Sequence, residues 1–372
     1  MTLDEVRGEI DEIDEKLLPL FLRRMACAKQ VAEIKRREKL PVFNEARERE
    51  ILDGTARKAG EFGGEARILY SDLMAMSRAV QHRLLGSGAA LRAAVEQADS
   101  APHRAETVAC LGERGSFSHE ALCRLYPDAQ PLFFPEFSAI FDAVARGDAD
   151  LGILPVENSS AGSVGEVYDL ILKYRFYIVS ALSLPVRHCL AAKAGETGDV
   201  RTVYSHPQAL RQCAEYLSAH GMHAVPCSST SAAAERAARG TAGEAAVCSR
   251  HAAKEFGLHL LAEDIQNNSG NRTRFVVISR SLHIPEDARK ISLCFSVPHR
   301  TGTLYAVLAR FAAAGLNLTK IESRPIPDRN FEYDFYLDFT GNARDKTTLD
   351  LLCALSGELE RFSFLGNYKE TE

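Results

Sequence analysis

The sequence lacks the features that mark membrane proteins, secreted proteins and most nucleic-acid-binding proteins. No apolar run among its 372 residues is long enough to span a bilayer. Met1 leads directly into an acidic amphipathic pattern, so no signal peptide is expected. The formal net charge of -5 argues against nucleic acid as the main partner. We therefore expect a cytoplasmic protein with no membrane partner, which holds any anionic ligand with local Arg and Lys side chains.

Motifs for metals and nucleotides are missing as well. The nine cysteines are scattered among mostly apolar neighbours, and neither a CxxC motif nor a Cys/His pair with metal-ligand spacing is expected. They are interpreted as reduced core residues, and no metal site is expected. The turn from Gly112 to His119 can present backbone N–H groups to an anion, but it is neither GxGxxG nor a phosphate-binding loop with its lysine. No cofactor is therefore predicted.

The length and composition predict two or three soluble domains, since 46% of the residues are hydrophobic and 26% are charged. The first domain is helical, because apolar residues follow a helical period over 3–39. Asn44 is a suitable N-cap for a second helix over 45–59, and a third helix is expected over 65–94. The first helix would be about 60 Å long, which is too elongated for a compact monomer, so we expect a dimer. Pro19 should kink it, at roughly 3 kcal/mol.

Several charged side chains share a face of these helices. Arg24 and Lys35 lie 11 residues apart, so they point the same way within roughly 20° and are about 16 Å apart along the axis. Arg7 lies about 100° off that face and roughly 25 Å from Arg24. An antiparallel partner chain could bring Arg7 to a small ligand held by the other two. Ser77 and Gln81 share one face of the third helix. Solvated charges on amphipathic helices would give the same pattern.

The polar residues that stand out in this segment are Arg7, Asp14-Glu15-Lys16, Arg23-Arg24, Lys35, Arg47-Glu48-Arg49-Glu50, Ser77 and Gln81. In this pattern the segment resembles the all-helical chorismate mutases, which are intertwined dimers that share one arginine between chains. The resemblance implies that Arg7, Arg24 and Lys35 grip the two substrate carboxylates, and that Lys35 and Gln81 donate to the ether oxygen. It assigns the hydroxyl end of the substrate and the orientation of Lys35 to Asn44, Arg47, Glu48 and Ser77. Asn44 stands where an aspartate is common.

Residues 105–282 follow a linker at 100–103 and have the pattern of an α/β domain. Short apolar strands alternate with helices, which predicts two lobes that clasp a ligand. The expected strands are 107–111, 132–134, 151–156, 178–184, 188–192, 203–205, 245–248 and 274–278. The expected helices include 138–146, 167–174, 207–220 and 231–238.

Three polar clusters follow strands, at 112–119, 155–163 and 204–208, and Thr273 and Arg274 stand at the entrance of another strand. Ligands bind at the carboxyl ends of strands in open α/β sheets, so the clusters can converge on one cleft. There Thr273 can donate a proton to a leaving group, and Arg274 can hold a carboxylate through two parallel hydrogen bonds. Each cluster alone could instead be a helix cap or ordinary strand-edge chemistry.

The stretches LGERGSFSHEA, PVENSSAGSV, YSHPQAL, STSAA and NRTRFVVIS together resemble prephenate dehydratase. The resemblance implies a fold like a periplasmic binding protein, with the site between the lobes. It implies that Thr273 helps the ring hydroxyl of prephenate to leave as water. The other residues that it places around the substrate are Ser116, Glu157, Asn158, Ser159, Ser160, Ser205, His206, Gln208 and Arg274. His206 could act as an acid or could shape the hinge.

Residues 288–372 have the order βαββαβ, with Gly302-Thr303-Leu304-Tyr305 at the start of the first helix and Glu322-Ser323-Arg324-Pro325 closing the second strand. This order and both motifs resemble the ferredoxin-like ACT domain, which binds an amino acid at a dimer interface. The residues implied to bind L-phenylalanine are Gly302, Thr303, Leu304, Glu322, Ser323, Arg324 and Pro325. The first motif usually reads Gly-Ala-Leu-Val, so the affinity is in doubt more than the ligand. A domain used only for dimerisation is the alternative.

These patterns predict a bifunctional enzyme with a helical mutase domain at 1–95, an α/β dehydratase domain at 105–282 and an ACT domain at 288–372. It would rearrange chorismate to prephenate and convert prephenate to phenylpyruvate, as a homodimer or tetramer inhibited by L-phenylalanine. One alternative is a dehydratase whose helical domain is only a dimerisation scaffold. Another is a non-catalytic amino-acid-binding regulator. The presence of Thr273 together with Arg24, Lys35 and Gln81 argues against the regulator.

Overall fold

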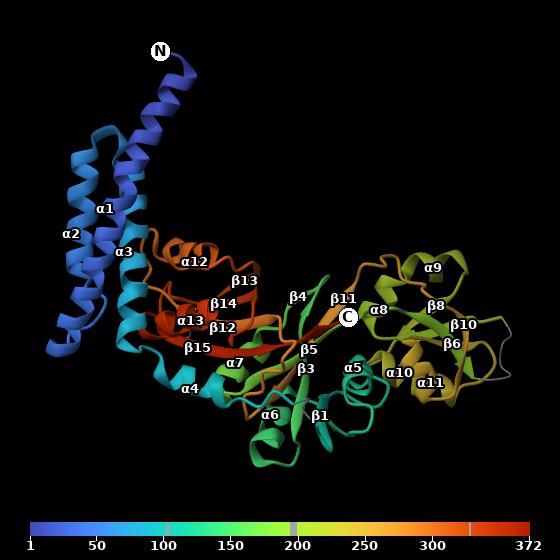
Figure 1. Ribbon diagram of the computed structural model, residues 1–372. Coiled ribbons are helices and arrows are strands. Elements are labelled where there is room, and N and C mark those ends of the chain that lie inside the picture. The colour runs from blue at the N-terminus through green and yellow to red at the C-terminus, as the bar shows by residue number, and fades with distance from the viewer. Residues whose placement is uncertain (102–103, 194–198, 327–328) are drawn as a thin grey trace. The chain divides into compact units, whose positions relative to one another are not determined.

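The computed structural model describes residues 1–101, 104–193, 199–326 and 329–372, and the chain divides into two compact units (Figure 1). The first unit joins Met1–Gln97 to Lys290–Phe364, and the second joins Ala98–Arg289 to Leu365–Glu372. Pro102 and His103 of the expected linker lie outside the described residues. Among the described helices, none has an apolar stretch of the length that crossing a membrane requires.

Helices make up the N-terminal part of the first unit: α1 (Leu3–Glu38), α2 (Glu45–Ala59), the 3-10 turn η1 (Gly60–Phe62), α3 (Gly63–Leu85) and α4 (Ala89–Gln97). A capping box between Thr2 and Glu5 starts α1, which continues through Pro19 without interruption. Asn44 caps α2 as predicted, because its side chain accepts a hydrogen bond of 3.0 Å from the backbone N–H of Arg47.

The third helix is shorter than the predicted 65–94. Gly86 adopts a left-handed conformation (φ 65°), donates its N–H to the carbonyl of His82 and ends α3 at Leu85. Glycine reaches this conformation without the steric penalty of a side chain, so a glycine just past the last periodic residue is a common helix stop. The chain then turns and begins α4 at Ala89.

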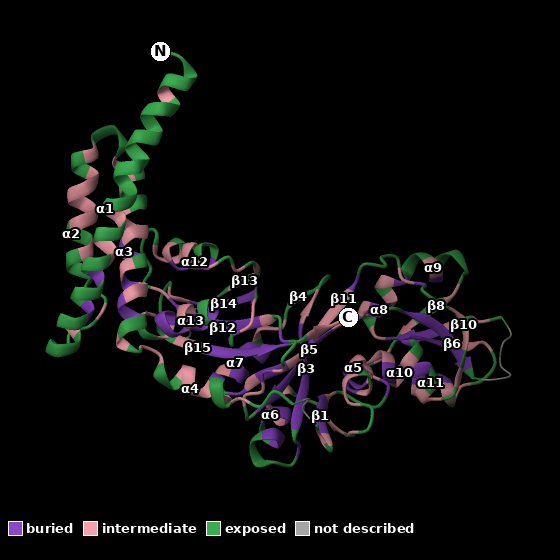
Figure 2. Cartoon of the chain, viewed as in Figure 1, coloured by how far each residue is buried: buried purple, intermediate pink, exposed green. Residues whose placement is uncertain are grey.

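The apolar face of α1 has little cover within the chain (Figure 2). Leu17 is 53% exposed and Leu20 is 61% exposed, although the sequence pattern marks both as interior positions. An exposed apolar stripe of this kind is typical of a surface that another chain covers. The predicted dimer is consistent with this exposure and stays a prediction.

The C-terminal part of the first unit is a four-stranded sheet in the order β13-β14-β12-β15, with two helices. Its elements are β12 (Lys290–Ser296), α12 (Thr303–Ala313), β13 (Leu318–Pro325), β14 (Tyr333–Thr340), α13 (Lys346–Glu358) and β15 (Glu360–Tyr368), of which residues 365–368 of β15 are counted with the second unit. The order βαββαβ agrees with the predicted ferredoxin-like fold. Phe311 of α12 meets Phe339 of β14 edge to face in the core, with ring centroids 4.9 Å apart. The helix α3 packs against both α12 and α13.

The second unit contains two sheets, and the larger has the order β16-β5-β11-β3-β1-β2, with β4 paired to β3. Its strands are β1 (Thr107–Leu111), β2 (Gln130–Phe134), β3 (Leu151–Asn158), β4 (Gly162–Ser163), β5 (Tyr177–Pro185), β11 (Arg272–Ser279) and β16 (Glu370–Thr371). The helices of this lobe are α5 (Phe117–Leu125), α6 (Phe137–Arg146) and α7 (Gly165–Tyr174). Val108, Ile153 and Val277 from β1, β3 and β11 belong to one buried core.

The smaller sheet has the order β10-β6-β9-β7-β8. Its strands are β6 (Cys189–Lys193), β7 (Thr202–Ser205), β8 (His223–Pro226), β9 (Glu244–Cys248) and β10 (Leu258–Ala262). Its helices are α8 (Pro207–Gln212), α9 (Ala214–Ala219), α10 (Thr230–Ala238) and α11 (Arg250–Glu255). The chain passes between the two sheets after β5 and again before β11, so this unit has the two predicted lobes.

One helix and several strands of the second unit differ from the sequence prediction. The helix expected over 207–220 is divided at Cys213 into α8 and α9. The strands β8 and β10 were not predicted, and both are partly exposed edge strands with weak apolar patterns. The C-terminal β16 was also missed: it pairs in parallel with β5. Just before it Gly366 lies so close to β5 that a Cβ atom would come within 2.1 Å of the carbonyl oxygen of Ile178.

Candidate active sites

A cavity of ≈ 270 Å³ lies in the second unit and is lined by both lobes. Four of the predicted dehydratase residues line it: Asn158, His206, Gln208 and Thr273. Asn158 is the last residue of β3, Thr273 is the second residue of β11, and the other two lie at the start of α8. The remaining lining residues are Phe117, Val186, His188, Ala209, Gln212, Ser228, Ser229, Thr230 and Asn271. The strand ends therefore converge as the sequence predicts.

The centre of this cavity is a contact between Asn158 and Thr273, which are paired across β3 and β11. The side-chain Oδ1 of Asn158 accepts hydrogen bonds of 2.9 Å from the backbone N–H groups of Ser160 and Ala161. Its amide is thereby fixed with Nδ2 toward Thr273, and Nδ2 donates to the hydroxyl oxygen at 2.9 Å. Within the described part of the chain this hydroxyl has no acceptor for its own proton. Thr273 is thus arranged to donate that proton to a group in the cavity.

Asn271 supports the same turn and was not singled out from the sequence. It is buried, and its Oδ1 accepts hydrogen bonds from Asn158 Nδ2 at 3.0 Å, Ser159 Oγ at 3.3 Å and Ser160 Oγ at 3.2 Å. The two serine hydroxyls therefore bind Asn271 and shape the turn after β3. They do not line the cavity.

Arg274 does not lie beside Thr273 in the cavity. Successive side chains of a strand point to opposite faces, and Arg274 turns away from the cavity. Its Nε donates to Glu370 Oε1 at 2.5 Å and its Nη2 to the hydroxyl of Tyr368 at 2.7 Å. The geometry therefore does not support the expectation that Arg274 grips a substrate carboxylate. The carboxylate that it binds comes from the C-terminal segment of the same chain.

Three further predicted residues have structural contacts outside the cavity lining. Ser116 caps α5 by accepting a hydrogen bond of 3.2 Å from the backbone N–H of His119. Ser205 is fully buried and ties β7 to β9 by donating to the carbonyl of Val247 at 2.6 Å. Glu157 stands opposite Arg274 in the strand pairing.

His188 is a cavity residue that the sequence analysis passed over. It is 2% exposed, and its Nε2 lies 2.9 Å from Gln212 Oε1, an acceptor, so the ring proton is on Nε2. Burial lowers the pKa of His188 more than this hydrogen bond raises it, which favours a neutral ring. His206 caps α8, and its Nδ1 accepts a hydrogen bond of 3.2 Å from the backbone N–H of Gln208.

Of the predicted mutase residues, Arg24 and Lys35 are held by contacts within the first unit. Arg24 of α1 donates to Ser77 Oγ at 2.6 Å and to the carbonyl of Leu73 at 2.7 Å, so it is held against α3. Lys35 donates to the carbonyl of Val42 at 2.5 Å. Burial lowers the pKa of Lys35, although the nearby Glu48 carboxylate opposes the shift. Two central cations of the predicted site are therefore fixed by contacts within one chain.

The other predicted mutase residues are less closely assembled. Gln81 is buried, and its Oε1 has no hydrogen-bond partner among the described residues. Asn44 is used as the cap of α2. Arg47 forms an exposed ion pair with Glu50 at 2.6 Å, and Arg7 forms one with Asp4 at 3.3 Å. In a single chain Arg7 is a surface residue, which agrees with the view that its ligand would belong to another chain.

A second cavity in the first unit, of ≈ 200 Å³, contains the first of the two predicted phenylalanine motifs. Gly302, Thr303 and Leu304 line it, and the aromatic residues Phe331, Tyr333 and Phe335 line it as well. The second motif, Glu322 to Pro325, lies on β13 at the edge of the sheet and does not line this cavity.

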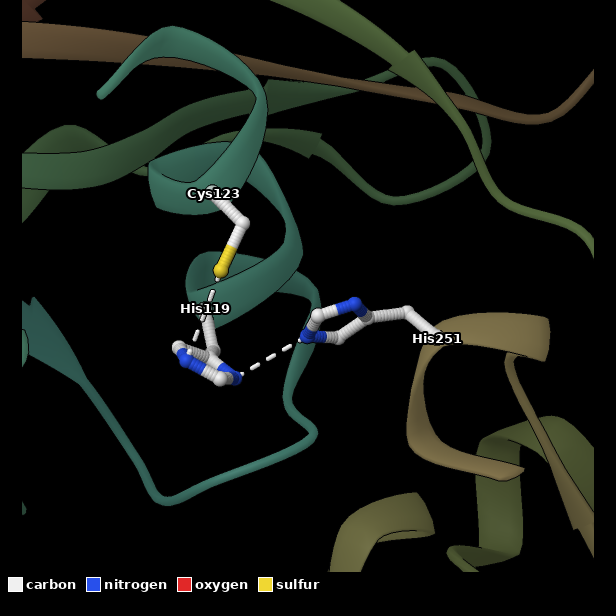
Figure 3. A group of neighbouring side chains, drawn as sticks. All are labelled: His119, Cys123 and His251. Carbon is white, nitrogen blue, oxygen red and sulfur yellow. Dashed lines mark hydrogen bonds between the residues drawn. The ribbon is translucent and has the colours of Figure 1, made fainter. Parts of the chain in front are cut away.

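His119, Cys123 and His251 form a third group, whose candidate ligand atoms lie within 4.8 Å of one another (Figure 3). His119 and Cys123 are one turn apart on α5, a metal-ligand spacing that the sequence reading overlooked. The Nδ1 of His119 accepts from the backbone N–H of Gly115 at 3.1 Å and lies 2.9 Å from His251 Nε2, which therefore carries the shared proton. Because that lone pair is engaged, we interpret the group as a hydrogen-bonded contact between α5 and α11.

Comparison with known proteins agrees with all three parts of the chain. Family models match as chorismate mutase type II over residues 6–82, prephenate dehydratase over 108–282 and ACT domain over 292–357. The bifunctional chorismate mutase/prephenate dehydratase of Aquifex aeolicus is 30% identical over 98% of this chain and 97% of its own length. The chain belongs to the bifunctional chorismate mutase/prephenate dehydratase family. This chain combines the two enzyme domains with an ACT domain.

Other similar proteins match about 70% of the chain. Arogenate dehydratase/prephenate dehydratase 2 of Arabidopsis thaliana is 39% identical over 70% of this chain and 72% of its own. The Arthrobacter aurescens prephenate dehydratase, solved in complex with L-Phe, is 33% identical, with a TM-score of 0.63 over 70% of this chain and 89% of that one. The structure of GqqA, described as a novel type of quorum quenching acylase, is 30% identical, with a TM-score of 0.65 over 71% of this chain and 98% of that one.

Proposed function

We propose that the chain converts prephenate to phenylpyruvate in the cavity around Thr273, and that it makes the prephenate from chorismate at the helical site. The observation that carries the first step is the contact in which Asn158 donates to Thr273 Oγ1 at 2.9 Å. It occupies a lone pair of the hydroxyl and turns the hydroxyl proton toward the cavity. No cofactor is needed, because aromatisation of the ring drives the reaction.

In the dehydratase step the C–O bond to the ring hydroxyl breaks, and the oxygen leaves as water with the proton of Thr273. The C–C bond to the ring carboxylate breaks at the same time. Its electron pair enters the ring, and carbon dioxide departs. Solvent then returns a proton to Thr273. A positioned proton donor contributes about 10²–10⁴-fold to a rate, so the hydroxyl is the group on which this step depends most.

At the helical site, Arg24 and Lys35 hold the substrate, and Arg7 of the partner chain completes the grip on its carboxylates. Lys35 and Gln81 donate to the ether oxygen, where negative charge grows as the bond breaks. The rearrangement is intramolecular, so fixed geometry and fixed charge are all that the protein supplies. The contacts of Arg24 with α3 support this assignment, because they hold one of the two cations in place within the chain. It requires at least a dimer.

The ACT domain is proposed to bind L-phenylalanine and to inhibit the enzyme. The cavity at Gly302, Thr303 and Leu304, with its aromatic wall, supports an aromatic amino acid as the ligand. The L-Phe complex of the Arthrobacter aurescens relative supports the same ligand. Glu322 to Pro325 would contribute from the edge strand of a second subunit. The expected compartment is the cytoplasm, which is consistent with nine free cysteines.

Paired substitutions test the two catalytic assignments. Thr273→Val removes the hydroxyl while keeping the shape of the side chain, and Thr273→Ser keeps the hydroxyl as a matched control. We expect Thr273→Val to abolish prephenate dehydration while mutase turnover is unchanged, and Lys35→Ala to do the reverse. If either change silences both activities in a folded protein, the assignment to two separate sites is wrong.

The substrate of the dehydratase is tested against its amino analogue. Arogenate carries an amino group where prephenate carries a keto group, and several relatives are named for it. The kcat/KM for the two compounds, measured with the same protein, decides between them. A preference for prephenate supports the proposal, and turnover of arogenate alone would overturn it for this site.

A further inference from the structure

Five charged or titratable side chains meet inside the first unit. Glu48 is one of the predicted mutase residues, and the other four belong to no predicted site. They are Glu48 of α2, Arg78 and His82 of α3, Arg310 of α12 and Glu358 of α13. The cluster therefore joins the helical segment that carries the mutase residues to the two helices of the ACT segment.

Glu358 is the centre of the cluster. Its Oε2 accepts from Arg78 Nε at 3.1 Å and from Arg310 Nη1 at 3.0 Å. Its Oε1 lies 2.9 Å from His82 Nε2. The side chain of Glu358 is 8% exposed, and those of Arg78 and Arg310 are 11% and 10% exposed. These are buried ion pairs, and removal of one partner leaves an uncompensated charge in the interior.

On its other side Arg78 holds Glu48. Both carboxylate oxygens of Glu48 lie 2.5 Å from Arg78 Nη1, and the guanidinium lies over the ring of Phe43, 5.3 Å from its centroid. Arg78 is thus fixed by Glu358 on one side, Glu48 on the other and an aromatic ring on its face. An arginine held in this way presents a rigid fork, which a lysine cannot reproduce.

Glu48 connects this cluster to the mutase residues. The charges of Glu48 and Arg78 act in opposite directions on the pKa of Lys35, after the larger effect of burial, so both lie within electrostatic range of the Lys35 ammonium. Lys35 is the cation to which the proposed reaction assigns the ether oxygen. If Arg78 releases Glu48, the carboxylate can move toward Lys35 and compete with the substrate oxygen for its proton.

We propose that Arg78 is a positioning residue of the mutase site and that Glu358 of the ACT helix α13 holds it in place. Glu48 then orients Lys35 only while the C-terminal helices are packed on α3. The inference rests on the proposed mutase function, and it adds two residues that touch no substrate.

The direct test is Glu358→Gln, which removes the charge of the anchor and keeps its size. We expect mutase kcat to fall about tenfold, as for a misplaced catalytic group, with KM within twofold of the wild type. Prephenate dehydration by the same protein should stay within twofold. Asp53→Asn, which removes the exposed partner of Arg67 between α2 and α3, is the matched control and should leave kcat unchanged.

A double-mutant cycle separates positioning from general support of the fold. If Glu358 acts through Arg78, the pair Arg78→Met/Glu358→Gln loses no more mutase kcat than Arg78→Met alone. Arg78→Lys should recover part of the loss, because it restores a charge without the fork. Additive losses, or a Glu358→Gln enzyme with wild-type kcat, would overturn the proposal. A wild-type protein without mutase turnover would overturn the proposed function as well, so the two failures are distinguishable.

Discussion

Replacing Asn158 by aspartate changes a single group in the contact that holds Thr273. The substitution keeps the Oδ1 atom, which accepts hydrogen bonds of 2.9 Å from the N–H groups of Ser160 and Ala161, so the turn after β3 should survive. It replaces Nδ2, which donates to Thr273 Oγ1 at 2.9 Å and to Asn271 Oδ1 at 3.0 Å, by a carboxylate oxygen, so the Asn271 amide must turn to present its NH2 group. The hydrogen bond must then reverse, and the hydroxyl of Thr273 donates its proton to Asp in place of the substrate.

The expected loss in dehydratase kcat is about 10²-fold, at the lower end of what a positioned acid contributes and equivalent to about 2.7 kcal/mol of barrier. KM for prephenate should change little, and mutase turnover should stay at the wild-type rate. Asn158→Ala removes the donor without adding an acceptor, so its loss in kcat should be smaller. It also removes the acceptor of two exposed backbone N–H groups, so it should be the less stable variant, by about 0.5–1.5 kcal/mol.

The two variants are therefore expected to rank in opposite orders for activity and for stability. The assay is steady-state dehydration of prephenate together with thermal unfolding of each protein. An Asn158→Asp enzyme within threefold of the wild-type kcat would refute the reasoning, because the proton of Thr273 would then not depend on the contact. The same holds if Asn158→Ala is the slower of the two.

Three further perturbations follow from ion pairs and buried groups. Glu370→Gln should destabilise the second unit by about 1–3 kcal/mol and lower dehydratase kcat, because Arg274, next to Thr273 on β11, loses the carboxylate that its guanidinium binds. Thermal unfolding measures the first effect, and a prephenate assay measures the second. Burial lowers the pKa of His119 and of His251 below 6.5, so as the pH falls the unfolded chain is protonated at these rings before the folded chain. The Tm of the second unit should therefore be constant above about pH 6.5 and decrease at lower pH. The decrease should be smaller in His251→Gln, which lacks one of the two rings. Burial raises the pKa of Glu358, but His82 and the two arginines outweigh this and lower it from 4.5 to about 2. A stabilisation of about 3 kcal/mol should therefore be lost as the pH falls from about 4.5 to 2. In Glu358→Gln, the free energy of unfolding should depend less on pH over this range.

Local patterns were sufficient to predict most of the fold. The strand at Thr107–Leu111 and the helix at Glu45–Ala59 begin and end where apolar periodicity and capping residues place them. The strand β11 was predicted correctly because a run of β-branched residues follows a polar segment. Elements that depend on contacts with residues far away in the sequence were not predicted. The strand β16 is two residues long, and nothing local distinguishes it from a disordered end.

The candidate dehydratase site shows the same division. Thr273, Asn158, His206 and Gln208 were found because they stand at strand ends and in family motifs. Arg274 was misplaced because its partner, Glu370, lies 96 residues away in sequence. Neighbouring positions on a strand also face opposite sides, which should have separated Arg274 from Thr273.

Other site residues were missed for a different reason. His188 was expected as the first residue of a strand, but the structure begins β6 at Cys189 and β11 at Arg272, so both His188 and Asn271 lie in connections between the lobes. The signal that could have found His188 is that residues 186 and 188 line one cavity while residues 185, 187 and 189 line another. Alternation of this kind is visible only once the chain is known to be extended there.

The central claim is that one chain carries two consecutive reactions under control of a third domain. The measurement that tests it most directly is an assay of the wild-type protein with chorismate, in which chorismate, prephenate and phenylpyruvate are followed separately with and without L-phenylalanine. The account predicts loss of chorismate, gain of phenylpyruvate and a lower rate when phenylalanine is present. Unchanged chorismate alongside rapid dehydration of added prephenate would contradict it, and would leave the helical segment as a scaffold for the dehydratase.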